Sequence, residues 1–239
     1  MGAMDRQLAN EALRRCVLFR RVTVEDLERC TAELAHRHYK RGETIFHAGD
    51  PGEAMHIVIE GAVKVELPSP NGDTPAILAT IEPGGFFGEL ALLDGEPRSA
   101  TVVALQATET LVLDRHRFER LMEDLPTLRS CLFASMSGEL RRLTGQVEAL
   151  LFLDLTGRLA TRILDIAQAE GGPVATTGSR KDVHLAWPYT QAELASMIGG
   201  SRESVNRLLG DFSQRGLLVI ERDRLTIPDL DALAAQVDR

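Results

Sequence analysis

The middle of the chain carries an apolar pattern that only a long helix satisfies. After Leu125, apolar side chains recur every three or four residues, and Pro126 suits the first turn of a helix. The pattern predicts a helix of about 27 residues, or about seven turns. An apolar face of that length favours pairing with a second copy over packing within one chain. The residues of this face are Leu125, Leu128, Leu132, Met136, Leu140, Leu143, Val147 and Leu150.

The residues before this helix have a strand pattern. Short runs of alternating apolar residues, such as 57–59, 63–65 and 77–81, are separated by turns that contain glycine. Short strands with such turns predict an antiparallel sandwich or barrel, and the strand pattern spans residues 39–113. The other elements expected here are helices at Asp5–Arg15, Val24–Ala35 and 115–123, and turns at 41–42, 49–52, 60–61, 71–72 and 83–85.

One segment of this region, FGELALLDGEPRSAT at residues 87–101, combines groups that suit a ligand with a phosphate and a sugar. Arg98 offers a planar fork of donors to a phosphate, and Ser99 with nearby backbone amides can complete an anion pocket. Gly88 permits close approach of the backbone, and Glu89 can accept a hydrogen bond from a ribose hydroxyl. The alternative is an ordinary surface turn with an arginine–glutamate ion pair.

The residues after the long helix predict a helix–turn–helix. Thr190 and Glu193 form a capping-box pattern that opens one helix. The pair Gly199–Gly200 then permits a tight turn, and Ser201 suits the cap of the next helix. The other elements expected here are a hinge at 154–158, a helix at 159–169 that the glycines at 171–172 end, a strand at 183–186 and a last helix at 230–237. Residues 217–220 and 225–227 stand where the family resemblance described below implies a wing hairpin.

The second helix of this motif carries side chains that can read DNA bases. Arg202, Glu203 and Arg207 lie within one and a half turns. In the major groove arginine can bind guanine, and glutamate can accept a hydrogen bond from cytosine. The alternative is an ion pair between Glu203 and Arg207 on a solvated helix. Such a pair contributes little to stability and does not account for two arginines near the helix start.

Both motifs resemble parts of one family. Residues 87–101 are similar to the phosphate-binding cassette of cyclic-nucleotide-binding domains, and SRESVNRLL at 201–209 is similar to the recognition helix of the Crp/Fnr family of transcription regulators. The resemblance covers nearly the whole chain, and it implies an α+β fold. Its expected parts are a cyclic-nucleotide-binding β-roll, antiparallel and jelly-roll-like, at residues 5–124, a dimerisation helix and hinge at 125–153, and a winged helix–turn–helix at 154–239.

The resemblance also implies a ligand, cyclic AMP, as an allosteric effector. Arg98 and Ser99 would hold its phosphate, and Glu89 its ribose 2′-hydroxyl. Leu143 and Thr144 stand where the family contacts the purine from the long helix, so only one of two hydroxyls is kept. The implied ligand-binding residues are Gly88, Glu89, Leu90, Arg98, Ser99 and Thr144.

The implied partners are a second copy of the chain, double-stranded DNA with a palindromic TGTGA-type operator, and RNA polymerase. An alternative within the family is a regulator that binds DNA without a cyclic nucleotide, or that answers another effector such as a haem-bound gas. The implied DNA-binding residues are Thr190, Gln191, Ser201, Arg202, Glu203, Ser204 and Arg207.

Composition and missing motifs weigh against other classes of protein. A net charge of −8 argues against indiscriminate nucleic-acid binding. No nucleophile elbow or dinucleotide fingerprint is visible, so we expect no catalytic residues and no enzyme. Three widely spaced cysteines and a lone His36-Arg-His38 pair predict no metal site. No apolar run approaches the ~18–20 residues that span a bilayer, and no secretory signal is visible, so we expect a cytoplasmic protein without a membrane partner.

Overall fold

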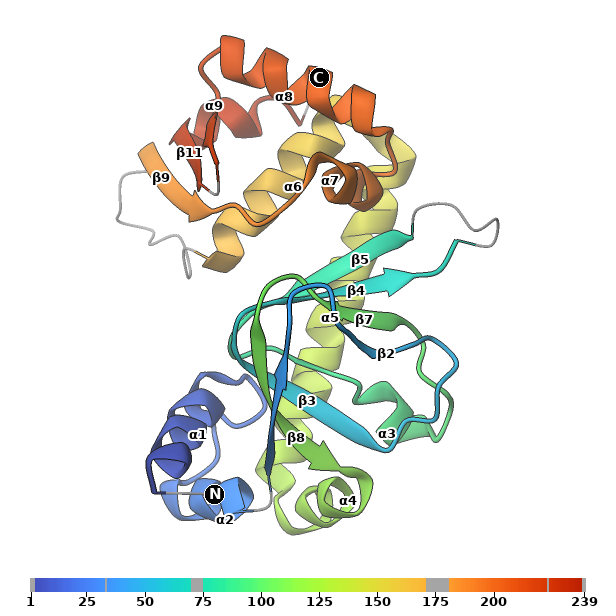
Figure 1. Ribbon diagram of the computed structural model, residues 1–239, viewed down its shortest axis with the longest axis vertical. Coiled ribbons are helices and arrows are strands. Elements are labelled where there is room, and N and C mark those ends of the chain that lie inside the picture. Colours follow the sequence, from blue (N-terminus) through green and yellow to red (C-terminus); the bar gives the residue numbers. More distant parts are fainter. Residues whose placement is uncertain (1–2, 33, 70–74, 171–180, 223, 238–239) are drawn as a thin grey trace. The chain divides into compact units, whose positions relative to one another are not determined.

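The computed structural model describes residues 3–32, 34–69, 75–170, 181–222 and 224–237. They form two compact units, residues 1–141 and 142–239, which are each described by themselves (Figure 1). The division falls within the long helix α5 (Pro126–Phe152), whose 27 residues and start at Pro126 agree with the sequence prediction. Among the described residues, no helix has the length and apolar character that a bilayer crossing requires.

The first unit is built on two four-stranded sheets, whose strand pairs in the described residues are antiparallel. Their strand orders are β1-β8-β3-β6 and β2-β7-β4-β5, which confirms the predicted β-roll. The strands are β1 (Ala35–Tyr39), β2 (Thr44–Phe46), β3 (Ala54–Glu60), β4 (Val63–Leu67), β5 (Ala76–Ile81), β6 (Phe86–Phe87), β7 (Thr101–Ala104) and β8 (Thr108–Asp114).

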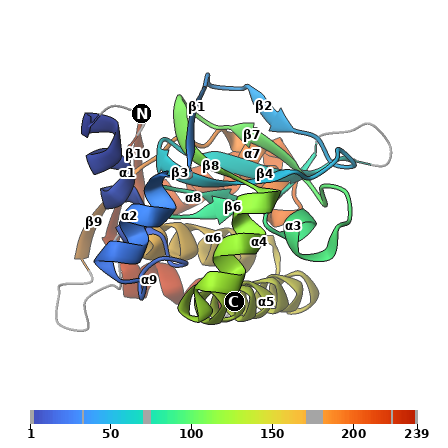
Figure 2. The same ribbon diagram turned by 90° about the horizontal axis from the view of Figure 1, so that it is seen from below.

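Apolar side chains from the strands and helices form the core of this unit. A small cluster inside the roll contains Val58, Val63, Phe87 and Val102. A larger cluster joins strands β3 and β8 to the helices at the ends of the roll, where α1 and α2 pack together (Figure 2). The helices of this unit are α1 (Ala3–Arg15), α2 (Val24–Ala32), α3 (Leu90–Asp94), α4 (Arg115–Asp124) and the first part of α5.

Three sequence expectations for this unit need correction or fall outside the described residues. Helix α2 ends at Ala32, and Ala35 already belongs to β1, where it pairs with Val112. Residues 87–101 are not a plain loop, because they contain the short helix α3, which Gly95 ends in a left-handed conformation at φ 76°. The turn expected at 71–72 lies outside the described residues.

The apolar pattern of α5 serves more than one purpose. Leu128 and Leu132 are buried in the core of the first unit, and Leu125 and Met136 pack against that core. The first turns of the helix therefore pack on their own unit, and the prediction of one continuous pairing face is wrong there. Leu140 and Val147, farther along, remain exposed.

The second unit contains a three-stranded antiparallel sheet and four helices in the described residues, as the winged helix–turn–helix prediction requires. The strand order is β10-β11-β9, and β10 with β11 forms the wing hairpin. The elements are α6 (Leu155–Glu170), β9 (Lys181–Ala186), α7 (Gln191–Ile198), α8 (Arg202–Gln214), β10 (Val219–Glu221), β11 (Arg224–Asp229) and α9 (Leu230–Ala234).

Helix boundaries in this unit differ from the sequence prediction where side chains cap helix ends. Helix α6 begins at Leu155, because Asp154 Oδ1 accepts a hydrogen bond from the Gly157 amide at 2.8 Å. Residues 155–158 of the predicted hinge thus form the first turn of α6, and the role of 154–158 as a hinge stays a prediction. Helix α8 continues to Gln214, whereas α9 already ends at Ala234. The glycines at 171–172 lie outside the described residues.

We expect the substitution Leu194→Ala to destabilise the second unit by about 2–5 kcal/mol, because Leu194 is fully buried and its loss leaves a cavity. Urea unfolding followed by the fluorescence of Trp187, the single tryptophan, measures this unit selectively. Val219→Ala on the exposed edge strand is the matched control, with an expected change below about 0.5 kcal/mol. Equal effects of the two substitutions would contradict the core assignment.

Candidate ligand pocket and nucleic-acid interface

Arg98 is held in the first unit by its backbone and by its guanidinium. Its amide donates to the Asp50 carbonyl at 2.9 Å, and its own carbonyl accepts from the Gly49 amide at 2.8 Å. Nη1 donates to the Gly88 carbonyl at 2.7 Å, and Nη2 donates to the Ala54 carbonyl at 2.6 Å. Arg98 is 7% exposed, and its buried Nε has no hydrogen-bond partner in the structure.

Two glycines allow the chain to close around this arginine. Gly88 has φ +84°, and a Cβ there would lie 2.6 Å from Nη1 of Arg98. A Cβ on Gly52 would lie 2.1 Å from the Cβ of Ala91 on α3. Since real Cβ atoms do not approach so closely, only glycine lets the 49–52 turn and α3 pack together here. The sequence showed Gly52 merely as a turn residue.

Aromatic side chains line the roll beside the guanidinium. Arg98 Cζ lies 4.1 Å from the centroid of the Phe46 ring, a favourable cation–π contact. His56 stacks on Phe87 with ring centroids 4.9 Å apart, and its Nδ1 lies 3.3 Å from Thr110 Oγ1. Burial lowers the pKa of His56 to about 4, with Arg98 contributing in the same direction. His56 is therefore neutral near pH 7, and Arg98 supplies the positive charge.

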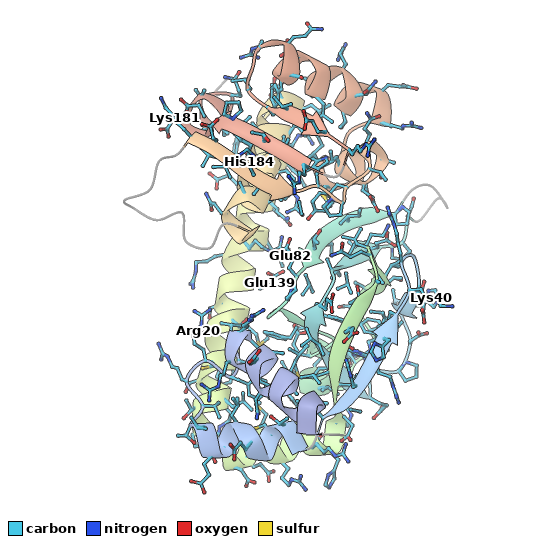
Figure 3. The ribbon with its side chains drawn as sticks, turned by 60° about the vertical axis from the view of Figure 1, so that its left-hand side comes forward. Arg20, Lys40, Glu82, Glu139, Lys181 and His184 are labelled. Carbon is cyan, nitrogen blue, oxygen red and sulfur yellow. The ribbon has the colours of Figure 1, made fainter. Side chains whose placement is uncertain are left out.

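Glu89 lies at the start of α3, between the arginine and the long helix. Burial raises the pKa of its carboxyl group, Glu139 on α5 raises it further, and Arg98 lowers it. Glu139 lies on the stretch of α5 beside the β-roll (Figure 3).

Arg115, at the start of α4, is a second arginine that sequence reasoning missed. Its Nη2 donates to the carbonyls of Gly52 and Ala91 at 2.7 and 2.8 Å, and its Nη1 to the carbonyl of Leu92 at 3.3 Å. It thus joins the 49–52 turn to α3 from the side of α4. No sequence pattern indicates this role, because the acceptors are backbone carbonyls far away along the chain.

The structure brings most of the predicted ligand-binding residues together. Residues 88–90, Arg98 and Ser99 all belong to the first unit, around the start of α3 and the turn before β7. Leu90 and Ser99 are exposed, whereas Arg98 is buried. Thr144 is exposed on α5 in the second unit, so its role toward a ligand stays a prediction.

The predicted helix–turn–helix has its caps in place. Thr190 Oγ1 accepts from the Glu193 amide at 3.2 Å, and Glu193 reaches back to the Thr190 amide at 2.9 Å. Ser201 Oγ accepts from the Ser204 amide at 3.2 Å and so caps α8. These three hydroxyl-bearing residues, Thr190, Ser201 and Ser204, therefore fix the two helix starts.

The turn between α7 and α8 is packed closely on α6. Gly199 adopts φ +66°, and a Cβ on Gly200 would lie 2.8 Å from Leu155 Cδ1. Arg158 Nη1 donates to the Ile198 carbonyl at 2.8 Å. Gln191 Nε2 donates to Asn206 Oδ1 at 2.8 Å, which links the starts of the two helices. The direction of α8 is consequently set by contacts on both sides of the turn.

The buried face of α8 leaves the predicted base-reading residues outside. Val205, Leu209 and Phe212 are buried in the second unit. Arg202, Glu203 and Arg207 are exposed near the start of the helix. Side-chain contacts at α8 are made by its cap residues Ser201 and Arg215 and by Asn206. Within the described part of the chain, Glu203 and Arg207 form no ion pair with each other.

Comparison with known proteins finds a family model that matches each of the two units. Residues 36–124 match a cyclic nucleotide-binding domain, and residues 157–236 match a Crp-like helix-turn-helix domain. A CRP-like cAMP-activated global transcriptional regulator of Mycobacterium tuberculosis is 31% identical over 229 residues, which cover 94% of this chain and 98% of the relative. The cAMP-activated global transcriptional regulator CRP of Escherichia coli is 30% identical over 189 residues, 77% of this chain and 87% of that protein.

Solved structures agree with this relationship at the level of the fold. FixK2 from Bradyrhizobium japonicum superposes with a TM-score of 0.74 at 22% identity, covering 85% of this chain and 96% of FixK2. The sensor sheets, the long helix and the capped helix–turn–helix thus occur here in an order shared with known regulators. The chain belongs to the Crp/Fnr family of DNA-binding transcription regulators.

Proposed function

We propose that this regulator is a homodimer whose affinity for a specific DNA operator is controlled by cyclic AMP bound in the first unit. The observation that carries the proposal is the buried guanidinium of Arg98. Relatives named as cAMP-activated regulators, at 30–31% identity, support the choice of nucleotide. Such a protein acts in the cytoplasm, where it binds double-stranded DNA and RNA polymerase. It regulates transcription and catalyses no reaction.

Arg98 is suited to an anion because its donors are only partly used. A guanidinium has five N–H donors, and the carbonyls of Gly88 and Ala54 take one from each terminal nitrogen. The buried Nε–H is left without a partner, which is costly for a cation inside a protein. A cyclic phosphate would supply acceptors and compensate the charge, with Ser99 as the neighbouring hydroxyl.

Glu89 and Thr144 extend the proposed ligand site to the sugar and the base. Glu89 has its carboxyl group beside the same arginine, where it would accept a hydrogen bond from the ribose 2′-hydroxyl. Thr144 would contact the purine, with Leu143 offering an apolar contact in place of a second hydroxyl. The proposed site therefore holds the phosphate and the ribose more firmly than the purine.

The exposed side of α5 suits the pairing of two copies. Phe133, Leu140, Val147 and Leu151 are between 55% and 70% exposed. Together with Ser137 and Thr144 they follow an alternating spacing of four and three residues, the spacing of a two-helix interface. Thr144 belongs to this face, so in a dimer the purine-contacting position would lie at the interface.

The exposed side chains of α8 suit base reading. In a symmetric dimer two such helices would enter successive major grooves about 34 Å apart, which requires a palindromic operator. Arg202, Glu203 and Arg207 would contact bases of a TGTGA-type half-site. Thr190, Gln191, Ser201 and Ser204 lie at the two helix starts, where they would contact phosphates and fix the register.

We expect Arg98→Lys to weaken cyclic AMP binding at least tenfold, because lysine keeps the charge but loses the fork of donors. Calorimetric titration of nucleotide-stripped protein with cyclic AMP, and with cyclic GMP for comparison, measures the change. Arg117→Lys on α4, where the arginine pairs with Asp114, is the matched control with unchanged affinity. Equal affinity of both variants for cyclic AMP would show that Arg98 does not bind the nucleotide.

We expect Arg202→Ala and Arg207→Ala each to cost ~1–3 kcal/mol of operator affinity and to relax sequence preference. Fluorescence anisotropy with operator and scrambled duplexes at one salt concentration measures both effects. Arg120→Ala on α4 makes the same change of charge in the sensor unit and serves as the control. An equal loss of affinity for every DNA sequence would show that these residues contact phosphates and not bases.

We expect the double substitution Leu140→Lys and Val147→Lys to weaken dimerisation at least tenfold, because it places cations on an apolar face. Sedimentation equilibrium over a range of protein concentrations measures the dissociation constant. Leu93→Lys, at an exposed apolar position on α3, is the control. An unchanged dimer would show that another surface joins the copies.

A nucleotide-independent regulator remains the alternative, because Leu143 departs from the purine contacts of the family. It predicts full operator affinity in nucleotide-free protein and no effect of Arg98→Lys on DNA binding. An effector such as a haem-bound gas would instead give a coloured protein as purified. The calorimetric titration above separates these cases from control by cyclic AMP.

A further inference from the structure

We propose that the outer face of the first unit holds a site for a divalent transition-metal ion of the zinc class, formed by His36, His38 and Glu109. The three residues each offer one ligand atom, and these atoms all lie within 4.8 Å of one another. The proposal concerns a site separate from the cyclic nucleotide and from DNA, and it does not rest on the function proposed above.

The pairing of two strands brings these residues together. His36 and His38 are two residues apart on β1, so their side chains leave the same face of the strand. Glu109 on the neighbouring strand β8 is the direct register partner of His38. Strand β1 is the edge of its sheet, and Lys40, which follows it, lies at the outer surface of the roll (Figure 3).

The ligand atoms converge on a common point. His36 Nε2 lies 3.0 Å from Glu109 Oε2, and His38 Nδ1 lies 3.1 Å from Glu109 Oε1. The two imidazole ring centroids are 4.4 Å apart. Metal–ligand bonds of about 2.0–2.1 Å in a tetrahedral site place neighbouring ligand atoms about 3.3 Å apart. Small side-chain rotations therefore suffice to close the three residues around one ion.

The types of ligand atom in this cluster indicate which class of metal ion it would bind. Two imidazoles and one carboxylate suit Zn²⁺ and related transition metals, whereas Mg²⁺ and Ca²⁺ prefer oxygen ligands. Two cationic imidazoles at this separation would repel one another, but neutral imidazoles with one carboxylate are the protonation state that binds a metal. Three protein ligands leave a fourth position for water or another donor.

A further carboxylate lies at the same end of the sheet. Glu60 on β3 is the register partner of Glu109 on its other side, and it is exposed. It adds negative charge beside the cluster. His38 is 66% exposed and His36 is 25% exposed, so an ion can reach the site from solvent while part of the site stays enclosed.

From the sequence, the histidine pair was expected to lie on a solvated segment without a metal. Glu109 is 73 residues away from His36 along the chain, and only the register of β1 against β8 brings the two together. The sequence expectation of no metal site is revised by this juxtaposition.

The test is a titration of untagged, chelator-treated full-length protein with Co²⁺, followed by visible absorption, with Zn²⁺ as the competitor. We expect one Co²⁺ per chain, displaced by Zn²⁺. We expect His38→Ala and Glu109→Gln to weaken binding at least tenfold, since each removes a ligand. His116→Ala, an exposed histidine outside the cluster, is the matched control with unchanged affinity.

A second readout keeps the result independent of folding defects. Zn²⁺ should raise the thermal unfolding temperature of wild-type protein and of His116→Ala, but not that of His38→Ala. His38 is mostly exposed, so its variant should unfold like wild type in the presence of chelator. No Co²⁺ binding by wild type, equal binding by His38→Ala, or the near-ultraviolet charge-transfer bands of thiolate ligation would each overturn the proposal.

Discussion

The burial of one charged group organises the sensor unit. The guanidinium of Arg98 donates to the carbonyls of Gly88 and Ala54 and lies against the ring of Phe46, and Gly88 has no side chain that would collide with it. A cation buried in this way needs compensation, and the two carbonyls provide only part of it because Nε–H stays unpaired. The same feature that constrains the fold therefore suits the anion proposed to bind there. Arg115 donates to the carbonyls of Gly52 and Ala91 and so joins α3 to the 49–52 turn.

The long helix α5 links the surroundings of Arg98 to the proposed dimer interface. One side of the helix packs on the first unit, and the other side is exposed. Its first turns bury Leu128 and Leu132 in the core of the first unit, and Glu139 on α5 adds to the effect of burial in raising the pKa of Glu89. Its exposed side carries Phe133, Leu140 and Val147 at intervals of seven residues. A change at residues 87–101 would therefore act on a helix that also carries the proposed interface. Reciprocal coupling between nucleotide and DNA affinity follows if the two ends of this helix respond together.

In the helix–turn–helix unit, the residues that position the two helices differ from those proposed to read bases. Capping hydroxyls, the close approach of Gly200 to Leu155 and the Arg158 bond to Ile198 determine how α7 and α8 meet. These contacts do not involve Arg202, Glu203 or Arg207, which are exposed on α8 and are the residues proposed to read bases. The His36, His38 and Glu109 cluster shows the same separation in the sensor unit, on an outer face away from its core.

The features that the sequence predicted correctly depend on residues close together in the chain. The Thr190–Glu193 capping box and the helix that starts at Pro126 are short-range patterns, and the structure contains both of them. The groups of residues 87–101 that suit an anion are also a short-range pattern, and their role toward a ligand stays a prediction. Only the tertiary structure decided which side of α5 is buried, which carbonyls receive Arg98 and Arg115, and that Glu109 stands beside two histidines on β1. The reason is physical: helix caps and turns depend on neighbours within a few residues, whereas burial, strand register and side-chain convergence depend on residues far apart in the chain.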